Sequence, residues 1–343
     1  MSPEVVTAWS EAARHFVDLE ELQDRVGERI AKLLKVESAL VTGGAASANM
    51  LATAAAITVR NDDFIQKQIA SNDGQPYEVL RQKRHRDPYD RQIETCGVKI
   101  VEVENEQDVE RLVSDRTVLM MAYNVYEPEG SINHEDWLRL ADTYSLPTLL
   151  DAAADTPPVD NLWRYSHMGY AMVTFSGGKT IRGPQNSGLL LGRTSLIEAA
   201  KKNAVPVEGV IGRVAKVSKE DIVGLWRALE IHLSRGDQIQ SRCQEQLRTI
   251  ETMVSEIPTI RCRFLTPEVA NHFPHLILEW DEASLGLTPD ELATSLRNGD
   301  PRIVTGRVYG TGTEGLLISA INLQPGEERL IGARVCEIFQ ALS

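Results

Sequence analysis

Hydrophobic residues recur along the chain in two alternating patterns, one with the period of a helix and one typical of short buried strands. Apolar residues at helical spacing predict an amphipathic helix over about 19–35. The alanine-rich run Ala45–Ile57 has strong helix propensity and follows Gly43-Gly44 directly. The predicted strands of this part are Ser38–Thr42, Lys99–Val103, Val118–Ala122, Thr148–Leu150, Ala171–Phe175 and Gly188–Leu191, with a helix over Glu135–Tyr144.

Strands that alternate with helices predict a mostly parallel sheet with helices on both faces. The pattern changes after about residue 215, where Glu220 to about Ile257 is predicted to be one long helix. We therefore expect an α/β protein with a large domain over 1–220 and a smaller C-terminal α+β domain over 221–343. The smaller domain is predicted to contain strands Ile260–Phe264, His275–Trp280, Ile303–Val308 and Leu316–Ala320, a helix beginning at Thr288-Pro289 and a last helix near Pro325.

Composition and charge narrow the possible partners. Of 343 residues, 42% are hydrophobic and 25% are charged, which is ordinary for a globular protein with a sizeable core. The net charge of −13 does not favour nucleic acid, whose phosphates need clustered positive charge. A small anionic ligand in a local basic pocket is compatible with this balance.

The cysteines and the N-terminus bear on the compartment. Cys96, Cys243, Cys262 and Cys336 lie far apart and form no CxxC pair, so we expect no structural metal and a reducing environment. The first residues do not have the basic and apolar regions of a secretory signal, and no apolar run approaches the roughly 20 residues of a membrane span. We expect a cytoplasmic protein without a membrane partner.

Lys179 lies on a tight turn that follows a predicted buried strand. The strand leads into Ser176-Gly177-Gly178, and Gly183-Pro184 follows soon after the lysine. A Walker A loop is excluded because Val173 stands where that motif needs a glycine. An exposed turn lysine remains the ordinary explanation. The alternative is a lysine that forms a Schiff base, which needs an amine partly desolvated in a pocket.

Asp151 makes the second explanation more attractive. It ends the apolar run Leu146–Leu150, and in parallel α/β sheets ligands bind at the carboxyl ends of strands. About one helical crossover and one more strand separate it from Lys179, so both are expected at the same sheet edge. Pyridoxal 5′-phosphate (PLP) needs this pair, a lysine for its aldehyde and a carboxylate for its pyridine nitrogen. For Asp151 alone, a helix cap is the alternative.

A phosphate site is predicted where the first strand meets the alanine-rich helix. Gly44, Ala45, Ala46 and Ser47 begin that helix, and backbone N–H groups at a helix N-terminus bind phosphate. Ser176 could add a hydroxyl that binds the same phosphate.

The charged run 83–91 offers further candidates. Its His85 could stack on the pyridine ring of PLP. The alternative is that the whole run is a solvated surface segment. Candidate arginines for a substrate carboxylate or phosphate are Arg86, Arg91, Arg302 and Arg307.

These residues resemble a known group. The stretches Phe175–Lys179, Gly183–Gln185 and Gly188–Arg193 are similar to the selenocysteine synthase-like branch of the fold-type-I PLP enzymes. Within that branch the chain most resembles the D-glucosaminate-6-phosphate ammonia-lyase group. Further matches are His85–Arg91, Asp151–Ala154 and Leu323–Glu328, so the resemblance covers nearly the whole chain.

The resemblance implies a fold, a cofactor and an activity. Lys179 would form the Schiff base, Asp151 would pair with the pyridine nitrogen, and the 44–47 turn with Ser176 would bind phosphate. The chain would be a homodimer or larger homo-oligomer that performs α,β-elimination on an amino sugar acid or β-hydroxy amino acid, giving a 2-keto acid and ammonia. Selenocysteine synthases carry an added N-terminal domain that engages tRNA, and none precedes Leu19, so we expect no tRNA substrate.

The resemblance leaves alternatives to this function open. Relatives have an extended segment before the position of Ser2-Pro3-Glu4 that helps to line the pocket. Without such a segment, a non-catalytic PLP-fold protein with a regulatory or scaffolding role is an alternative. Racemisation, aldol cleavage and β-lysis would use the same Lys179 and Asp151. An α/β binding protein without PLP would require the lysine, the aspartate and the glycine turn to coincide by chance.

Overall fold

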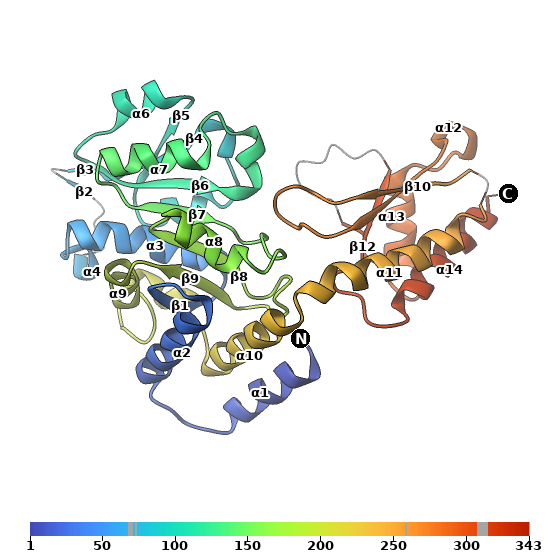
Figure 1. The fold of residues 1–343 in the computed structure, drawn as a ribbon, viewed down its shortest axis with the longest axis horizontal. Helices are drawn as coiled ribbons and strands as arrows, with labels where there is room; N and C mark the ends of the chain where they lie inside the picture. Colours follow the sequence, from blue (N-terminus) through green and yellow to red (C-terminus); the bar gives the residue numbers. More distant parts are fainter. Residues whose placement is uncertain (68–70, 73, 258, 307–314, 343) are drawn as a thin grey trace. The chain divides into compact units, whose positions relative to one another are not determined.

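The computed structural model describes residues 1–343 except 68–70, 73, 258, 307–314 and 343. The chain forms two compact units, Met1–Ser234 and Arg235–Ser343 (Figure 1). Within the described ranges, no helix is both long and apolar enough to cross a bilayer.

A seven-stranded sheet organises the first unit, with the order β1-β9-β8-β7-β6-β4-β5. β9 runs antiparallel to both of its neighbours, whereas the pairs β4–β5, β4–β6, β6–β7 and β7–β8 are parallel. The predicted mostly parallel sheet is therefore confirmed. The strands are β1 (Ser38–Thr42), β4 (Glu78–Gln82), β5 (Lys99–Val103), β6 (Thr117–Tyr123), β7 (Thr148–Asp151), β8 (Met172–Ser176) and β9 (Gly188–Gly192).

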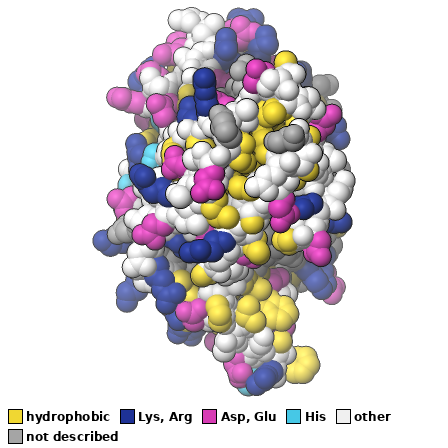
Figure 2. Space-filling view, turned by 90° about the vertical axis from the view of Figure 1, so that its right-hand side faces the viewer, with side chains coloured by type: hydrophobic (Ala, Val, Ile, Leu, Met, Phe, Trp, Pro, Cys, Tyr) yellow, Lys and Arg dark blue, Asp and Glu magenta, His cyan; other side chains and the backbone are white. Residues whose placement is uncertain are grey.

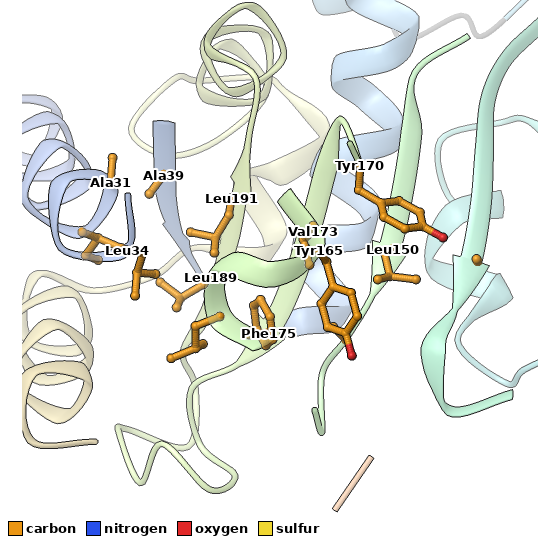
Figure 3. Packing of buried hydrophobic residues seen from close by; sticks show 14 of the residues in the cluster. Ala31, Leu34, Ala39, Leu150, Tyr165, Tyr170, Val173, Phe175, Leu189 and Leu191 are labelled. Carbon is orange, nitrogen blue, oxygen red and sulfur yellow. The ribbon is translucent and has the colours of Figure 1, made fainter. Parts of the chain in front are cut away.

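Helices cover both faces of this sheet because its strands are apolar on both sides. On one face, Leu150, Val173 and Leu191 pack with residues of the helices that carry Leu34 and Tyr165 (Figure 3). On the other face, neighbouring strand residues pack against the alanine-rich helix. The helices of the unit are α1 (Pro3–Ala13), α2 (Leu19–Leu34), α3 (Ala45–Arg60), α4 (Phe64–Lys67), α5 (Asp90–Glu94), α6 (Glu106–Leu112), α7 (His134–Thr143), α8 (Asn161–Met168), α9 (Thr194–Lys202) and α10 (Lys219–Arg235).

Helix α2 illustrates how local signals and packing agree. Its N-cap Asp18 accepts a hydrogen bond from the Glu21 amide, and it ends at Lys35 in the left-handed conformation. Gly27 faces β1 so closely that a β-carbon there would lie 2.4 Å from the Ala39 carbonyl oxygen. A larger residue at position 27 would therefore push the helix away from the sheet.

Strand β4, which lies between β6 and β5 in the sheet, has no counterpart among the predicted strands. Its five residues are all buried, yet two of them, Glu78 and Arg81, are charged. Each charge has partners: Arg116 bonds Glu78 at 2.7 Å, and Arg81 bonds Glu102 at 2.8 Å. Buried charges are tolerated when they are paired in this way. The charged residues hide the apolar pattern, so only the structure reveals this strand.

The second unit is built around a small antiparallel sheet with the order β10-β11-β12. Leu247, Leu276, Leu292 and Val335 belong to its core. The elements are α11 (Asp237–Val254), β10 (Arg261–Leu265), β11 (His275–Glu279), α12 (Glu282–Leu285), α13 (Pro289–Asn298), β12 (Leu316–Ser319) and α14 (Glu327–Gln340). A mostly parallel α/β unit with a smaller α+β unit is the predicted fold class.

Two predicted elements differ from the structure. The single long helix over 220–257 is wrong, because α10 and α11 are separate helices with Gly236, a poor helix former, between them. The strand predicted over Ile303–Val308 is absent at 303–306, where the Ile303 amide instead bonds the Leu296 carbonyl oxygen of α13 at 3.0 Å. Residues 307 and 308 lie outside the described residues.

Candidate active site

The carboxyl ends of the parallel strands bring the main candidate residues to one edge of the sheet. Asp151 ends β7 and is in register with Tyr123 on β6 and Thr174 on β8. At the end of β8, Ser176 pairs with Gly188 of β9, which also pairs with Thr42 at the end of β1. The glycine turn after β1, the aspartate of β7 and the lysine turn after β8 therefore follow strand ends at this edge.

The Asp151 carboxylate is held at both of its oxygens. Asn49 on α3 donates from Nδ2 to Oδ2 at 2.6 Å, and the Ala153 amide donates to Oδ1 at 2.9 Å. Burial raises the pKa of Asp151, whereas these two hydrogen bonds and the positive charge of Lys179 lower it, and burial outweighs them. A cation placed beside this carboxylate would favour its ionised form.

Lys179 lies on a compact loop whose backbone is fixed by internal hydrogen bonds. The Gly177 amide bonds the Ser187 carbonyl at 2.9 Å, and the Gly183 amide bonds the Gly177 carbonyl at 2.8 Å. A β-carbon on Gly178 would lie 2.8 Å from the Gln185 α-carbon, so this loop requires glycine there. The Lys179 residue itself is exposed. Lys179 therefore lies at the strand end on a turn that is held by internal hydrogen bonds.

A second contact joins the lysine loop to the loop that follows Asp151. The buried Thr180 hydroxyl donates to the Thr156 carbonyl oxygen, and the Thr156 hydroxyl bonds Nε2 of His232 on α10 at 2.7 Å. Burial lowers the pKa of His232 to about 4, so its imidazole is neutral near pH 7. These contacts fix the lysine loop and the Asp151 loop relative to each other.

The turn after β1 has the features of an anion-binding helix N-terminus. Gly44 has φ of 122° and begins α3, and the first amides of a helix have no partner within it. A β-carbon on Gly188 would lie 2.5 Å from the Gly44 carbonyl carbon, so β9 and this turn touch through two glycines. Ala45 and Ala46 keep the turn free of large side chains. The Ser47 hydroxyl is directed back to the Gly44 carbonyl oxygen at 2.8 Å.

His85 is buried in the short helix after β4. Its Nδ1 accepts a hydrogen bond from the Tyr123 amide at 3.3 Å, and its Nε2 has no partner within the described part of the chain. Burial, aided by the charges of Arg81 and His134, lowers the pKa of His85 to about 4. The ring is therefore uncharged near pH 7, and it lies beside Tyr123, the last residue of β6, which is in register with Asp151.

The candidate arginines differ in their surroundings. Arg86 is bound to the Glu102 carboxylate by three hydrogen bonds of 2.8–3.0 Å, although it is otherwise exposed. Arg91 lies exposed on α5. Arg302 is an exposed residue of the second unit, where it lines a cavity of about 200 Å³ with Ser319 and Glu327. Arg307 lies outside the described residues.

Three polar residues near this edge are absent from the sequence-based candidates. Asn49 bonds Asp151, and Thr174 donates to Asn49 at 3.0 Å. Asn124, directly after β6, donates to the Tyr165 hydroxyl at 2.8 Å, and its buried Oδ1 has no partner among the described residues. The sequence did contain a signal for Asn49, which is the only amide side chain in an alanine-rich helix. Burying such an amide is costly without a hydrogen-bond partner, so its presence indicates a polar partner nearby.

The residues at this edge fit PLP. A glycine turn at a helix N-terminus suits the phosphate, and a buried carboxylate with a raised pKa suits a protonated ring nitrogen. Across the described residues, no group of three or more histidine, cysteine, aspartate or glutamate side chains could hold a metal ion. These groups supply what an anionic cofactor with a protonated ring nitrogen requires, which is a phosphate-binding turn and a carboxylate.

The chain is similar to known proteins along nearly its whole length. The D-glucosaminate-6-phosphate ammonia lyase of Salmonella typhimurium (strain 14028s / SGSC 2262) is 26% identical, over 99% of this chain and 91% of that protein. A solved structure of D-glucosaminate-6-phosphate ammonia-lyase covers 100% of this chain and 92% of its own, with 26% identity and a TM-score of 0.85. The chain has the fold of the fold-type-I PLP enzymes.

Other similar proteins have different names. A 5′-C-glycyluridine monooxygenase-decarboxylase of a Streptomyces species is 26% identical, over 88% of this chain and 77% of that protein. An L-seryl-tRNA(Sec) selenium transferase of Aquifex aeolicus (strain VF5) is 24% identical, over 57% of this chain and 49% of that protein. No family model matches the chain. The predicted resemblance to the selenocysteine synthase-like branch is confirmed, and the names show that one architecture hosts several reactions.

Proposed function

We propose that this protein is a PLP-dependent carbon–nitrogen lyase. Its substrate would be an amino sugar acid or another β-hydroxy α-amino acid, which it would convert to a 2-keto acid and ammonia. The observation that carries the proposal is the pair of adjacent parallel strands, β7 and β8, that lead to Asp151 and Lys179. The similar D-glucosaminate-6-phosphate ammonia lyase, matched along nearly the whole chain, supports the reaction class.

Each residue at the edge would have a distinct role. When bound, PLP supplies an aldehyde for the substrate amine and a ring that accepts electrons from the α-carbon. Lys179 would hold the cofactor through Nζ and, after the substrate amine replaces it, take the proton from the substrate α-carbon. Asp151 would accept a hydrogen bond from the ring nitrogen and keep it protonated. The 44–47 turn and Ser176 would bind the phosphate, and the neutral His85 ring would lie against the pyridine.

The carboxylate or phosphate groups of the substrate would be bound by arginine side chains. Arg86, Arg91 and Arg302 are candidates because a guanidinium binds a carboxylate or phosphate through two hydrogen bonds. Arg86 would have to exchange its Glu102 partner for the substrate, since Glu102 occupies its guanidinium. A substrate that carries more negative charge competes better for this arginine.

A PLP titration tests the proposal first. The protein, treated with PLP and then freed of excess cofactor, should keep the visible absorbance of PLP bound to a lysine. Lys179→Ala should lose that band, whereas Lys202→Ala, an exposed lysine of α9, should keep it. The loaded protein is then screened against amino sugar acids and D- and L-amino acids for release of ammonia and a 2-keto acid. A wild-type protein that takes up no PLP would refute the proposal.

A second candidate function is a different reaction at the substrate α-carbon. The similarity to a protein named 5′-C-glycyluridine monooxygenase-decarboxylase supports this candidate, because that name denotes a reaction other than ammonia elimination. Racemisation would invert stereochemistry at unchanged mass, and aldol cleavage or β-lysis would shorten the carbon chain. A protein that holds PLP at Lys179 but turns over none of the screened compounds would instead favour a non-catalytic role.

We also propose a homo-oligomer in the cytoplasm. Around α1 the first unit exposes Met1, Val6, Trp9, Phe16 and Val17, and apolar groups gathered on a surface often mark protein contacts. Within the described residues the cysteines form no disulfide, which suits a reducing compartment. Basic and acidic side chains are intermixed on the face shown in Figure 2, in keeping with a small-molecule substrate rather than nucleic acid.

A further inference from the structure

Asn49 is a fully buried amide, and it is the only amide side chain of the alanine-rich helix α3. Its residue exposure is 0%, and Ala48 and Met50, its neighbours along α3, are buried as well. Burial of an amide is costly unless its polar atoms are hydrogen-bonded. Both of its side-chain atoms have partners: Nδ2 donates to Asp151 at 2.6 Å, and Oδ1 accepts from the Thr174 hydroxyl at 3.0 Å.

The chemistry of the partners sets the direction of this chain of hydrogen bonds. An ionised carboxylate can only accept, so Asn49 must present its NH₂ group to Asp151. Its amide oxygen then faces Thr174, whose hydroxyl can donate to it. Thr174 is buried on β8 and in register with Asp151, so its position is fixed by the sheet. The threonine thereby selects the amide orientation that supports a carboxylate.

We propose that Asn49 is a positioning residue that holds Asp151 ionised and correctly oriented for the cofactor, with Thr174 fixing the orientation of the Asn49 amide. This inference rests on the proposed function, because it assigns the relay to the carboxylate that would pair with the PLP ring nitrogen. The Ala153 amide holds the other oxygen of Asp151, so the carboxylate is fixed from two sides. The other groups whose charges act on Asp151 or on its neighbour Tyr123 are Lys179, Asp87 and Asp90.

The first test is the affinity for PLP. Asn49→Ala should bind PLP about tenfold to a hundredfold more weakly, since it removes a hydrogen bond to a charged group. Thr53→Ala is the matched control, because Thr53 is buried on the same helix and its hydroxyl bonds the Asn49 main-chain oxygen at 2.9 Å rather than the Asn49 side chain. Equal PLP affinity of the two variants would overturn the inference.

The relay also predicts how two substitutions combine. Thr174→Val keeps the shape of the side chain but removes the donor, and it should weaken PLP binding about twofold to tenfold. In the double variant, Thr174→Val should add little to Asn49→Ala, because the threonine acts through the asparagine. Fully additive losses would mean two independent packing effects and would contradict the relay.

The apo protein separates this inference from the proposed function. The Asp151 carboxyl is titrated by carbon NMR in wild-type protein, Asn49→Ala and Thr53→Ala, with Asp151→Asn to assign the signal. Asn49→Ala should raise the pKa of Asp151 and Thr53→Ala should leave it unchanged. If the wild type took up no PLP but Asn49→Ala still raised this pKa, the relay would stand and the proposed function would fall. An unchanged pKa in Asn49→Ala would refute the relay, whether or not PLP binds.

Discussion

Gly188 of β9 and Gly44 of the turn after β1 touch through their backbones. A β-carbon on Gly188 would lie 2.5 Å from the Gly44 carbonyl carbon and 2.7 Å from the Ala45 nitrogen. Real β-carbons do not approach other atoms this closely, so the turn keeps its shape only while position 188 is glycine. The proposed phosphate site thus depends on a residue from a strand far along the sequence.

Gly188→Ala should therefore weaken PLP binding. The added methyl group must displace the turn, at a cost of about 1–3 kcal/mol, typical of overpacking. Gly192→Ala is a matched control, since its β-carbon would lie 2.4 Å from the Ala171 carbonyl oxygen at the opposite end of the same strand. Both variants should lose stability in a denaturant titration, but only Gly188→Ala should lose PLP affinity. Equal affinities would argue against this turn as the phosphate site.

Asp151→Asn should abolish most of the lyase activity while the fold is retained. Asparagine has the same shape as aspartate but no charge, so the variant would lose the ion pair between Asp151 and the protonated ring nitrogen of PLP. Loss of one member of a buried ion pair costs about 3–5 kcal/mol. Turnover and PLP affinity are measured together, with Asp160→Asn as the control, because Asp160 is exposed at the start of α8 and makes no side-chain cap bond. Full activity in Asp151→Asn would remove this residue from the mechanism.

His232 should make the protein less stable in mild acid. Its pKa is about 4 in the folded chain and about 6.5 when unfolded, so only the unfolded form binds a proton between these values. Stability is therefore complete above about pH 6.5 and falls as the pH drops towards 4, by about 3 kcal/mol from this group. His85, whose pKa is also lowered to about 4, should likewise reduce the stability of the folded protein as the pH falls.

The measurement is the midpoint of urea unfolding from pH 7.5 to pH 4. His232→Gln can keep the hydrogen bond to Thr156 but does not titrate, so its stability should fall less steeply than that of the wild type. Exposed His15 on the N-terminal segment provides the control, since His15→Gln should follow the wild-type curve. Parallel curves for His232→Gln and the wild type would contradict the assignment.

Phe16 should contribute to self-association. Its side chain is fully exposed between α1 and α2, beside a cavity of about 390 Å³ lined by Ala8, Val17 and Val223 among others. Phe16→Ser should shift the protein towards monomer in light scattering after size-exclusion chromatography, because it removes apolar contact area. Val214→Ser, at another exposed apolar position, is the comparison. A wild-type monomer would contradict the proposed oligomer.

The sequence was sufficient to predict the principal strands and the residues that end them. Leu146–Leu150 and Ala171–Phe175 are mostly apolar runs, each with a single threonine, and short runs of this kind indicate strands buried on both faces. Because parallel strands present their carboxyl ends at one edge, Asp151 and Lys179 could be expected there together. Where charge entered a buried strand, as in β4 with Glu78 and Arg81, the pattern failed.

The chain by itself therefore determined the α/β architecture, the candidate lysine and carboxylate, and the glycine turn before α3. Only the tertiary structure decided three contacts. Asn49 donates a hydrogen bond to Asp151, and Arg86 forms an ion pair with Glu102. The backbones of Gly188 and Gly44 are in close contact. The reason is physical. Periodicity and strand ends are properties of neighbouring residues, whereas these contacts join residues distant in sequence, and they depend on the order of the strands in the sheet.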